Sequence, residues 1–437
     1  MTAPAVPTPP GALDGLVVED PAAGTFRVAR RAMVDPVVLD AERRLIFDRS
    51  WLYVGHESEV PSPGDFRCRE VAGRPLVLVR GADDRVRVLY NTCSHRGARV
   101  VRQDEGSARH FECFYHAWTY DSTGALVRVP GEEAYPQGWT KEALGLRSPS
   151  RVDAHRGLVF VAFDAGVPPL PDYLGAATPW LDLVLDQFAG GMRVLAGCHT
   201  STVRANWKLL VENTCDTYHL RSLHATYFAY VRGRGGGPSP QRPPGRTVDL
   251  GSGHHAVEAP EQTHRPVARW APIFGEEARH DMAEVRAGLV ARFGEERAYR
   301  IADTLKNVVV FPTLMVVDAV STILRVVEPL APGLSRVVTW ALAGAAETEE
   351  QVERRLGPFL LFQGPGGFAS PDDIEAVESC QLGFAAGEVA WSDLSKGYGR
   401  VDPDVADEDA QRTFWRHWQR CLAGAPADGL PAVRRLL

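Results

Sequence analysis

Residues 91–124 read NTCSHRGARVVRQDEGSARHFECFYHAWTYDSTG and contain two similar short motifs. Each motif joins one cysteine to one histidine, as Cys93-x-His95 and as Cys113-x-x-His116, with seventeen residues between them. Two loops of this kind can bring two thiolates and two imidazoles to one metal centre. A structural zinc ion and a mixed-ligand iron–sulfur cluster are both compatible with these donors.

The order of the donors favours the iron–sulfur cluster. Zinc fingers tend to pair Cys with Cys and His with His, whereas a Rieske [2Fe–2S] cluster has two thiolates on one iron and two imidazoles on the other. Both loops resemble the cluster-binding loops of Rieske proteins, although Ala117 stands where a glycine usually precedes the tryptophan. The resemblance implies a cluster that is held by Cys93, His95, Cys113 and His116.

The surrounding sequence is typical of short β-strands. Segments rich in β-branched and aromatic residues are separated by Gly, Asp and Pro, at 75–80, 86–90 and 158–163. Upstream, Asp35-Pro36 predicts a helix that begins with an aspartate cap and ends near Trp51. Downstream, we expect helices at 180–188, 206–223, 276–304, 371–384 and 407–422, with three strands within 307–342. Strands and helices without regular βαβ alternation predict an α+β fold.

A second group of metal-binding residue types lies within the predicted helix at 206–223. Glu212, Asp216 and His219 have the i, i+4, i+7 spacing of one helical face. His224 follows His219 by five residues, which is about 140° around an ideal helix, so we expect the helix to distort or end there. Two histidines and one carboxylate with open positions form the facial triad of non-haem Fe(II) oxygenases. The carboxylate must come from elsewhere, and segment 370–378 (SPDDIEAVE) is the best candidate.

These motifs together resemble the large (α) subunit of the Rieske non-haem iron aromatic ring-hydroxylating dioxygenases, from about residue 26 to residue 422. The resemblance rests on the two Rieske loops, Asn206-Trp207-Lys208, Glu212-Asn213, Asp216-x-Tyr218-His219-x₄-His224 and Asp372-Asp373-x-Glu375. It implies that His219, His224 and Asp373 bind the mononuclear Fe(II), with Asp372 as the alternative to Asp373. It also implies that Asp216 bridges a cluster histidine of one subunit and an iron histidine of the next. Asn213 corresponds to an asparagine near the iron.

The implied function is that of a terminal oxygenase that hydroxylates an aromatic ring with O₂. The sequence looks closer to the benzoate branch than to the naphthalene branch, so we expect cis-dihydroxylation of a benzoate-like aromatic acid. The main alternative is a Rieske monooxygenase, either an O- or N-demethylase or a quaternary-amine hydroxylase, because it shares every ligand. An electron-transfer protein without oxygenase chemistry and a zinc-stabilised binding protein are the remaining alternatives.

The expected partners follow from what the sequence lacks and from the resemblance. No ferredoxin-type cysteine run and no nicotinamide fingerprint occur, so a ferredoxin, an NAD(P)H reductase or both must supply electrons. The family joins its two metal sites across subunits in head-to-tail trimers, which predicts an α₃ core or an α₃β₃ assembly with a small β subunit.

The resemblance also sets the expected domain organisation. An N-terminal all-β Rieske domain should precede a catalytic domain in which helices surround an antiparallel sheet, as in helix-grip folds. We expect a disordered tail at 1–11, a helical segment of the catalytic domain at 12–51, the Rieske domain at 52–166 and the catalytic domain at 167–437. The Gly/Pro/Arg-rich segment 232–246 is compatible with a lid over the site and with a surface loop. Arg325, on a predicted strand, is interpreted as a member of an ordinary salt bridge, with a substrate carboxylate as the alternative partner.

Composition excludes several other classes. The 437 residues are 45% hydrophobic and 24% charged, which excludes a disordered or fibrous chain. A net charge of −7 argues against a nucleic-acid partner. Seven cysteines do not indicate a disulfide framework, and no segment reads as a membrane span or a secretory signal. We therefore expect a cytoplasmic protein.

Overall fold

The computed structural model describes residues 11–233, 245–260 and 264–424, and it divides into two compact units. One unit is Phe47–Leu170, and the other combines the chain before it with the chain after it. The expected tail at 1–11 and the expected lid or loop at 232–246 lie largely outside the described residues. No helix among the described residues is long and apolar enough to cross a membrane.

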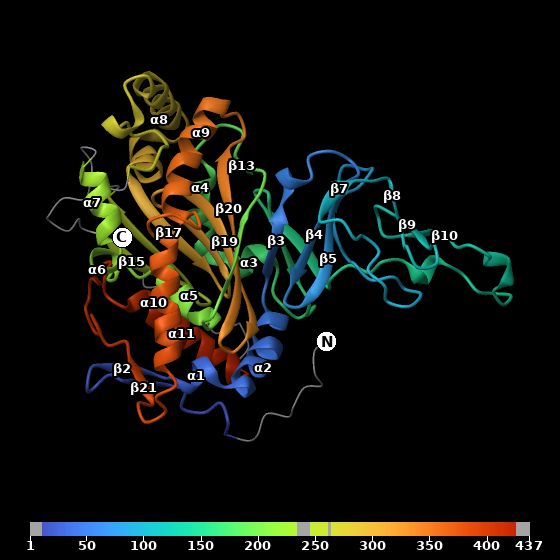
Figure 1. Cartoon of the computed structure of the whole chain (residues 1–437), viewed down its shortest axis with the longest axis horizontal. Helices are drawn as coiled ribbons and strands as arrows, with labels where there is room; N and C mark the ends of the chain where they lie inside the picture. The colour runs from blue at the N-terminus through green and yellow to red at the C-terminus, as the bar shows by residue number, and fades with distance from the viewer. Residues whose placement is uncertain (1–10, 234–244, 261–263, 425–437) are drawn as a thin grey trace. The chain divides into compact units, whose positions relative to one another are not determined.

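The Phe47–Leu170 unit is built from three small antiparallel sheets (Figure 1). Their strand orders are β6-β5-β4-β7, β11-β12-β3 and β10-β9-β8. The strands are β3 (Leu52–His56), β4 (Asp65–Val71), β5 (Arg74–Arg80), β6 (Val86–Tyr90), β7 (Glu105–Ser107), β8 (His110–Glu112), β9 (Thr119–Asp121), β10 (Leu126–Arg128), β11 (Arg151–His155) and β12 (Leu158–Ala162). All five residues of β12 are buried because this strand is paired on both edges.

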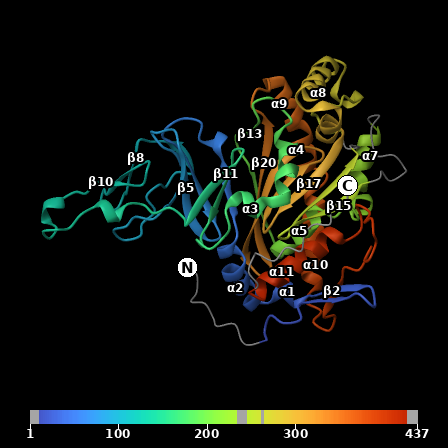
Figure 2. The same ribbon diagram turned by 180° about the vertical axis from the view of Figure 1, so that it is seen from behind.

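The second unit is organised around an eight-stranded antiparallel sheet (Figure 2). Its order is β13-β20-β19-β18-β17-β16-β15, and β14 also pairs with β20. The strands are β13 (Met192–Val194), β14 (His199–Val203), β15 (Arg246–Gly251), β16 (His254–Pro260), β17 (Thr304–Val310), β18 (Leu314–Asp318), β19 (Thr322–Ala331) and β20 (Leu334–Gly344). A separate small sheet has the order β1-β2-β21, with β1 at Val17–Asp20, β2 at Thr25–Ala29 and β21 at Trp391–Asp393.

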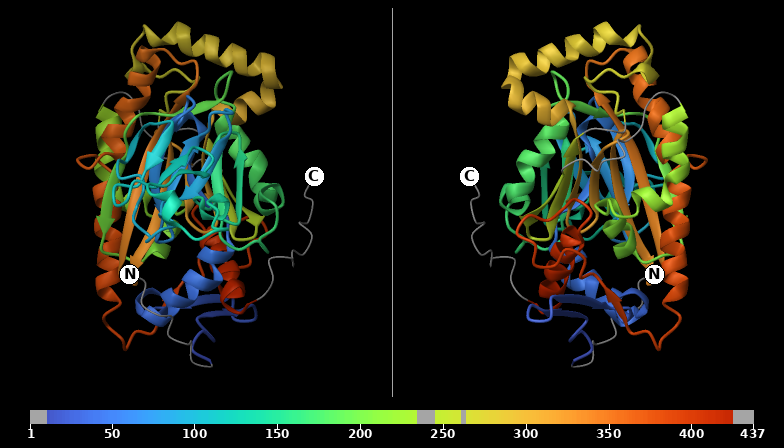
Figure 3. Two further views of the ribbon diagram at one scale, coloured as in Figure 1. Left: turned by 90° about the vertical axis from the view of Figure 1, so that its right-hand side faces the viewer. Right: turned by 90° about the vertical axis from the view of Figure 1, so that its left-hand side faces the viewer.

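Helices pack against this sheet and carry the site. They are α1 (Arg31–Val34), α2 (Pro36–Leu45), α3 (Leu170–Leu174), α4 (Thr178–Leu185), α5 (Trp207–Thr214), α6 (Leu220–Leu223), α7 (Ala225–Gly233), α8 (Ala278–Ala302), α9 (Glu349–Pro358), a π-helical turn (Phe359–Gln363), α10 (Ser370–Gly383) and α11 (Asp409–Leu422). Helix α5 packs on β17, β18 and β19 and contacts α10 and α11, as Figure 2 shows. Helix α8 bends at Gly294, where φ is 77°, and the bend is visible in Figure 3. The expected α+β class is confirmed.

Three sequence-based boundaries are wrong for identifiable reasons. The helix that begins at Asp35-Pro36 has the expected aspartate cap, but it ends at Leu45 and a short 3₁₀ turn follows. The helix expected at 206–223 is interrupted after Thr214. The region 307–342 holds four strands, because the chain turns between β18 and β19. Thr322 donates a hydrogen bond to Asp318 across that turn (2.8 Å), and the apolar residues on both sides conceal it in the sequence.

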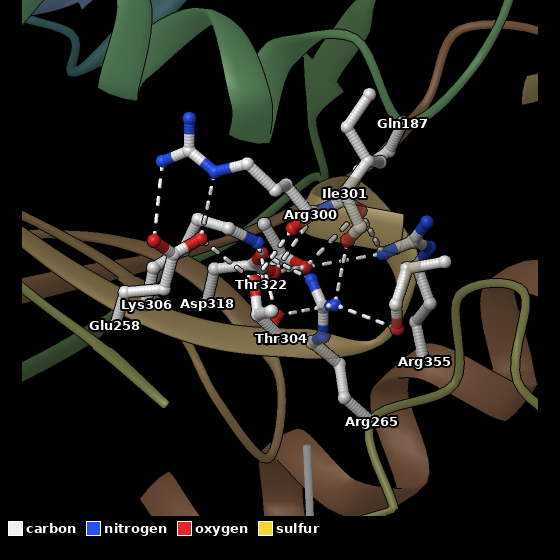
Figure 4. Close-up of polar contacts among 11 residues, drawn as sticks. Gln187, Glu258, Arg265, Arg300, Ile301, Thr304, Lys306, Asp318, Thr322 and Arg355 are labelled. Carbon is white, nitrogen blue, oxygen red and sulfur yellow. Dashed lines mark hydrogen bonds and ion pairs between the residues drawn. The ribbon is translucent and has the colours of Figure 1, made fainter. Parts of the chain in front are cut away.

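A buried ionic network joins the end of α8 to the sheet (Figure 4). Arg265 and Lys306 both contact the Asp318 carboxylate, and all three side chains are fully buried. The Arg265 guanidinium also donates to the carbonyl groups of Ile301 (2.7 Å) and Ala302 (3.2 Å). Because these are the last carbonyls of α8, the arginine satisfies acceptors that have no partner within the helix.

Candidate functional site

The two Cys/His loops share one backbone design. In the first loop the Cys93 N–H donates to the Ala98 carbonyl (2.8 Å), and the Gly97 N–H donates to the Cys93 carbonyl (2.8 Å). In the second loop Cys113 makes the same two bonds, to the Trp118 carbonyl (2.8 Å) and from the Ala117 N–H (2.9 Å). Gly97 and Ala117 therefore occupy equivalent positions, and both have positive φ, of 75° and 56°. This backbone requirement explains why glycine is usual at the position of Ala117.

The four donors of these loops form two pairs, one of cysteines and one of histidines. Cys93 and Cys113 are buried and close enough for Cys93 to raise the pKa of the Cys113 thiol, an effect smaller than that of burial itself. The rings of His95 and His116 have centroids 4.5 Å apart. The His95 Nδ1 atom is buried and has no hydrogen-bond partner among the described residues. A pair of neighbouring thiols and a pair of neighbouring imidazoles fit a mixed-ligand iron–sulfur cluster, in which two thiolates hold one iron and two imidazoles hold the other.

Neighbouring side chains fix this arrangement. The Trp118 ring stacks on the His95 ring, with centroids 5.0 Å apart and an interplanar angle of 8°. The Tyr120 hydroxyl lies 3.2 Å from the Cys93 sulfur and accepts a hydrogen bond from the Ser94 N–H (3.1 Å). Burial, followed by the contact with Cys93, raises the pKa of Tyr120, so this hydroxyl keeps its proton and can donate it to the sulfur.

A compact triangle of ligand atoms forms in the other unit. The His219 Nε2 and His224 Nε2 atoms are 3.2 Å apart, and Asp373 Oδ1 lies 3.5 and 3.2 Å from them, respectively. Each of these three residues offers one ligand atom, and the three atoms lie within 4.8 Å of one another, close enough to bind a single metal ion. Ligands that bind one ion at about 2.1 Å and at right angles lie about 3.0 Å apart, so the triangle fits a single metal ion.

Local backbone structure explains how both histidines face one point. Helix α5 ends at Thr214, so Asp216 lies in a turn, and the single helical face expected for Glu212, Asp216 and His219 does not form. The Asp216 carboxylate accepts the Tyr218 N–H (2.7 Å), a side-chain bond that competes with helix continuation. His219 and His224 then flank the one-turn helix α6. The helix was expected to distort or end between these histidines, but it ends earlier, at Thr214, and the separate helix α6 lies between them.

Two polar neighbours hold the triangle. Asp216 Oδ2 lies 3.1 Å from His219 Nδ1, so the proton of this ring stays on Nδ1 and Nε2 presents its lone pair to the triangle. Asn213 Nδ2 donates to Asp373 Oδ1 (3.1 Å). Burial raises the pKa of Asp373, but the histidine contacts and the Asn213 bond outweigh it and keep the pKa below its ordinary value.

Asp373 and Asp372 differ in what they face. Asp373 shares the triangle with the Nε2 atoms, whereas the Asp372 carboxylate lies 3.6 Å from Nδ1, on the other side of the His224 ring. Both belong to the first turn of α10, where acidic residues are also favoured by the helix dipole.

The Asn206-Trp207-Lys208 motif has a structural role. Asn206 caps α5 by accepting the Lys208 N–H (3.1 Å). The Lys208 ammonium pairs with the Glu42 carboxylate (2.6 Å), and both side chains are fully buried. Trp207 and Trp418 also donate their indole N–H groups to Glu42 (2.8 and 2.7 Å). Glu42 therefore ties α2, α5 and α11 together, a role that no local sequence signal reveals.

Aromatic side chains lie next to the triangle. The Phe362 ring is 5.6 Å from the His224 ring and 4.6 Å from that of Tyr227. A buried cluster continues from there and comprises Tyr227, Val231 and Val320, with Phe228, Tyr230, Leu361, Phe362 and Phe368 packed against it. Phe362 and Phe368 are not recognisable from the sequence as members of this cluster, because the distant segment 359–368 brings them to it.

Comparison with known proteins agrees with both candidate metal sites, the two Cys/His loops and the triangle of ligand atoms. Residues 50–143 match the Rieske [2Fe-2S] domain family, and residues 190–424 match the family described as ring hydroxylating alpha subunit (catalytic domain). The chain is 32% identical to the 2-halobenzoate 1,2-dioxygenase large subunit of Burkholderia cepacia, covering 88% of this chain and 83% of the relative. It is 31% identical to the toluate 1,2-dioxygenase subunit alpha of Pseudomonas putida, covering 88% and 84%.

A solved structure extends the likeness to the fold. A naphthalene 1,2-dioxygenase with indole bound in its active site matches with a TM-score of 0.81 at 26% identity, covering 93% of this chain and 94% of that one. A Rieske [2Fe–2S] cluster and a mononuclear non-haem iron are the cofactors of such oxygenases, and the donor sets described above fit both groups. The chain belongs to the family of Rieske non-haem iron ring-hydroxylating oxygenase alpha subunits.

Proposed function

We propose that this oxygenase cis-dihydroxylates a benzoate-like aromatic acid at an iron held by His219, His224 and Asp373. The converging triangle of Nε2, Nε2 and Oδ1 atoms is the observation that carries the proposal. The substrate class is supported by relatives named for 2-halobenzoate and toluate, both of which are benzoate-type acids. Cys93, His95, Cys113 and His116 are proposed to hold the Rieske cluster, and Asp372 is not a ligand.

When bound, the cluster stores one electron at a time and the mononuclear iron activates O₂ beside the substrate. The chain's own residues prepare the site for this chemistry. Asp216 keeps the His219 proton on Nδ1, and Asn213 fixes the orientation of the Asp373 carboxylate. The aromatic cluster around Phe362 offers apolar contacts to an aromatic ring.

We further propose that the electrons come from a ferredoxin, an NAD(P)H reductase or both, and that the chain assembles as a head-to-tail trimer. The named relatives are large or alpha subunits, which supports an assembly with smaller β subunits. In such a trimer Asp216 would connect His219 to a cluster histidine of the next subunit. A measured mass of three large subunits, with or without three small ones, is the expected result.

The direct test is a panel of aromatic acids, neutral arenes and N-methylated amines, supplied with a surrogate reductase and ¹⁸O₂. Dihydroxylation of a benzoate-type acid with two labelled oxygen atoms in one product molecule is the expected result. One labelled atom, or loss of a methyl group, would instead identify a monooxygenase. His219→Ala is the matched control, because it should abolish product formation and leave the visible spectrum of the cluster unchanged.

A further inference from the structure

Arg325 occupies an unusual position on the central strand β19. It is the one residue of the stretch 322–327 that keeps accessible surface, while its five neighbours are buried. In the sheet register it lies directly opposite Met315 on β18 and Thr339 on β20. Directly opposed residues share one face of a sheet, and the Met315 sulfur on that face accepts the hydroxyl proton of Thr214 from α5. Arg325 therefore faces the helix that leads into the iron-site turn.

The hydrogen-bond partners of Arg325 are neutral. Its Nε donates to the Thr339 hydroxyl (3.3 Å), and its Nη2 donates to the Gln363 side-chain carbonyl. Within residues 11–233, 245–260 and 264–424, no carboxylate lies within salt-bridge distance of this guanidinium. Among these residues, the ordinary salt bridge that the sequence suggested for Arg325 does not form. Other arginines of the sheet and its flanks are neutralised, for example Arg336 by Glu328 and Arg265 by Asp318.

The same short segment connects Arg325 to the iron triangle. Gln363 ends the π-helical turn, and the preceding residue, Phe362, has its ring against the His224 ring. The Ser370 hydroxyl donates to Gln363, at 3.1 Å to the main-chain carbonyl and 3.3 Å to the side-chain oxygen, and Ser370 begins α10, three residues before Asp373. Burial lowers the pKa of Arg325, and the Asp373 carboxylate opposes this effect, so the two groups interact electrostatically.

A guanidinium that is withdrawn from water and paired only with neutral acceptors has a large unmet preference for an anion. Two of its five N–H donors are used, so about three remain for a ligand. A planar carboxylate is the group that matches the guanidinium fork. The aromatic cluster that begins at Phe362 supplies the apolar contacts that an attached ring needs.

We propose that Arg325 binds the carboxylate of the substrate and thereby selects aromatic acids over neutral arenes. This inference rests on the proposed function, because it assigns a role within the substrate site of that reaction. Gln363 is the positioning residue that holds the guanidinium. Phe362 contacts the aromatic ring of the substrate, which lies between Arg325 and the iron ligands.

The test compares Arg325→Gln, Arg325→Lys and the control Arg336→Gln, which removes a strand arginine that already has its own carboxylate. Benzoate and benzamide serve as an acidic and a neutral probe. Arg325→Gln should raise the KM for benzoate about 100-fold and change the KM for benzamide less than about threefold. Arg325→Lys should recover part of the loss, and Arg336→Gln should leave both KM values unchanged.

A binding measurement separates this inference from the proposed function. Benzoate should raise the melting temperature of the wild-type holoenzyme and of Arg336→Gln, but not that of Arg325→Gln. Without benzoate, Arg325→Gln should melt at or above the wild-type temperature, because it removes a largely desolvated charge that forms no salt bridge with a described carboxylate. An arginine with a purely structural role would lower the melting temperature when replaced.

The outcomes are distinguishable. If benzoate binds in an Arg325-dependent manner and no aromatic acid is turned over, the proposed function fails and the assignment of Arg325 stands. If benzoate is turned over with an unchanged KM in Arg325→Gln, or if both probes are affected equally, the assignment of Arg325 is overturned. Absence of any benzoate-induced shift in the wild type also overturns it.

Discussion

Ala117 illustrates how much a single residue contributes in a cluster-binding loop. Its φ of 56° lies in the left-handed region, which costs a non-glycine residue roughly 1–2 kcal/mol. Glycine would relieve this cost, although it loses about 0.4–1 kcal/mol through the greater freedom of the unfolded chain. The difference from the usual glycine is therefore a small local strain that leaves the two hydrogen bonds of the loop intact.

We predict that Ala117→Gly stabilises the protein by about 0.5–1 kcal/mol without altering the cluster spectrum. Urea unfolding followed at the visible absorbance of the cluster measures this directly. The matched control is Ala98→Gly in the first loop, where φ is not positive, and this variant should lose about 0.4–1 kcal/mol. Equal effects of the two substitutions would contradict the strain at Ala117.

Glu212 shows a second effect at the scale of a single residue, because its carboxyl group is buried. Burial raises its pKa from 4.5 to about 7, and the hydrogen bond from the Trp415 indole opposes the shift. Between these two pH values the folded protein holds a proton that the unfolded chain has released. Stability from this group therefore falls as the pH rises from 4.5 through 7.

We expect Glu212→Gln to be more stable than the wild type by roughly 3 kcal/mol at pH 8 and by less than roughly 1 kcal/mol at pH 5, because the amide carries no charge to bury. Urea unfolding at the two pH values provides the comparison. A gain that is the same at both pH values would show that the carboxyl group is not titrating in the folded state.

Secondary-structure elements differ in how far the sequence predicts them. Strand β6 and the aspartate cap of α2 match their expected positions, because local residue preferences decide them. The end of α5 and the turn between β18 and β19 do not, because side-chain bonds from Asp216 and Thr322 create them. The converging histidines were predictable from spacing and resemblance. Arg325 and Phe362 were not recognisable as neighbours of the site, because only the sheet register and the π-helical turn bring them there.

The network around Asp318 leads to a prediction for the α8–sheet contact. Asp318→Asn would leave the fully buried Arg265 and Lys306 without their counter-ion, which typically costs about 3–5 kcal/mol. A strongly lowered melting temperature is expected. Glu276→Gln, which removes an exposed partner of Arg279, is the control and should leave the melting temperature unchanged.

At the scale of the whole molecule, the proposed head-to-tail trimer makes turnover a property of neighbouring subunits. Asp216→Asn should keep the cluster and the iron but slow oxidation of the reduced cluster severely, since an amide cannot accept hydrogen bonds from two imidazoles in the same way. Stopped-flow absorbance with substrate and O₂ records this rate. An oxidation rate equal to that of the wild type would rule out the bridging role.

Subunit mixing tests the same assembly independently. Trimers co-assembled from His219→Ala subunits, which lack the iron site, and Cys93→Ala subunits, which lack the cluster, should regain part of the turnover. Each variant alone should be inactive. If the mixed trimers are also inactive although both subunits are present, electrons do not pass between neighbouring chains.

Metal content of the purified protein tests most directly whether this chain holds two separate iron centres. The wild type should contain about three irons and two acid-labile sulfides per chain, and reduction should give the electron paramagnetic resonance signal of a Rieske cluster. His219→Ala should contain about two irons with the same signal. A wild-type protein without that signal, or a His219→Ala variant that keeps the third iron, would contradict the two-centre assignment.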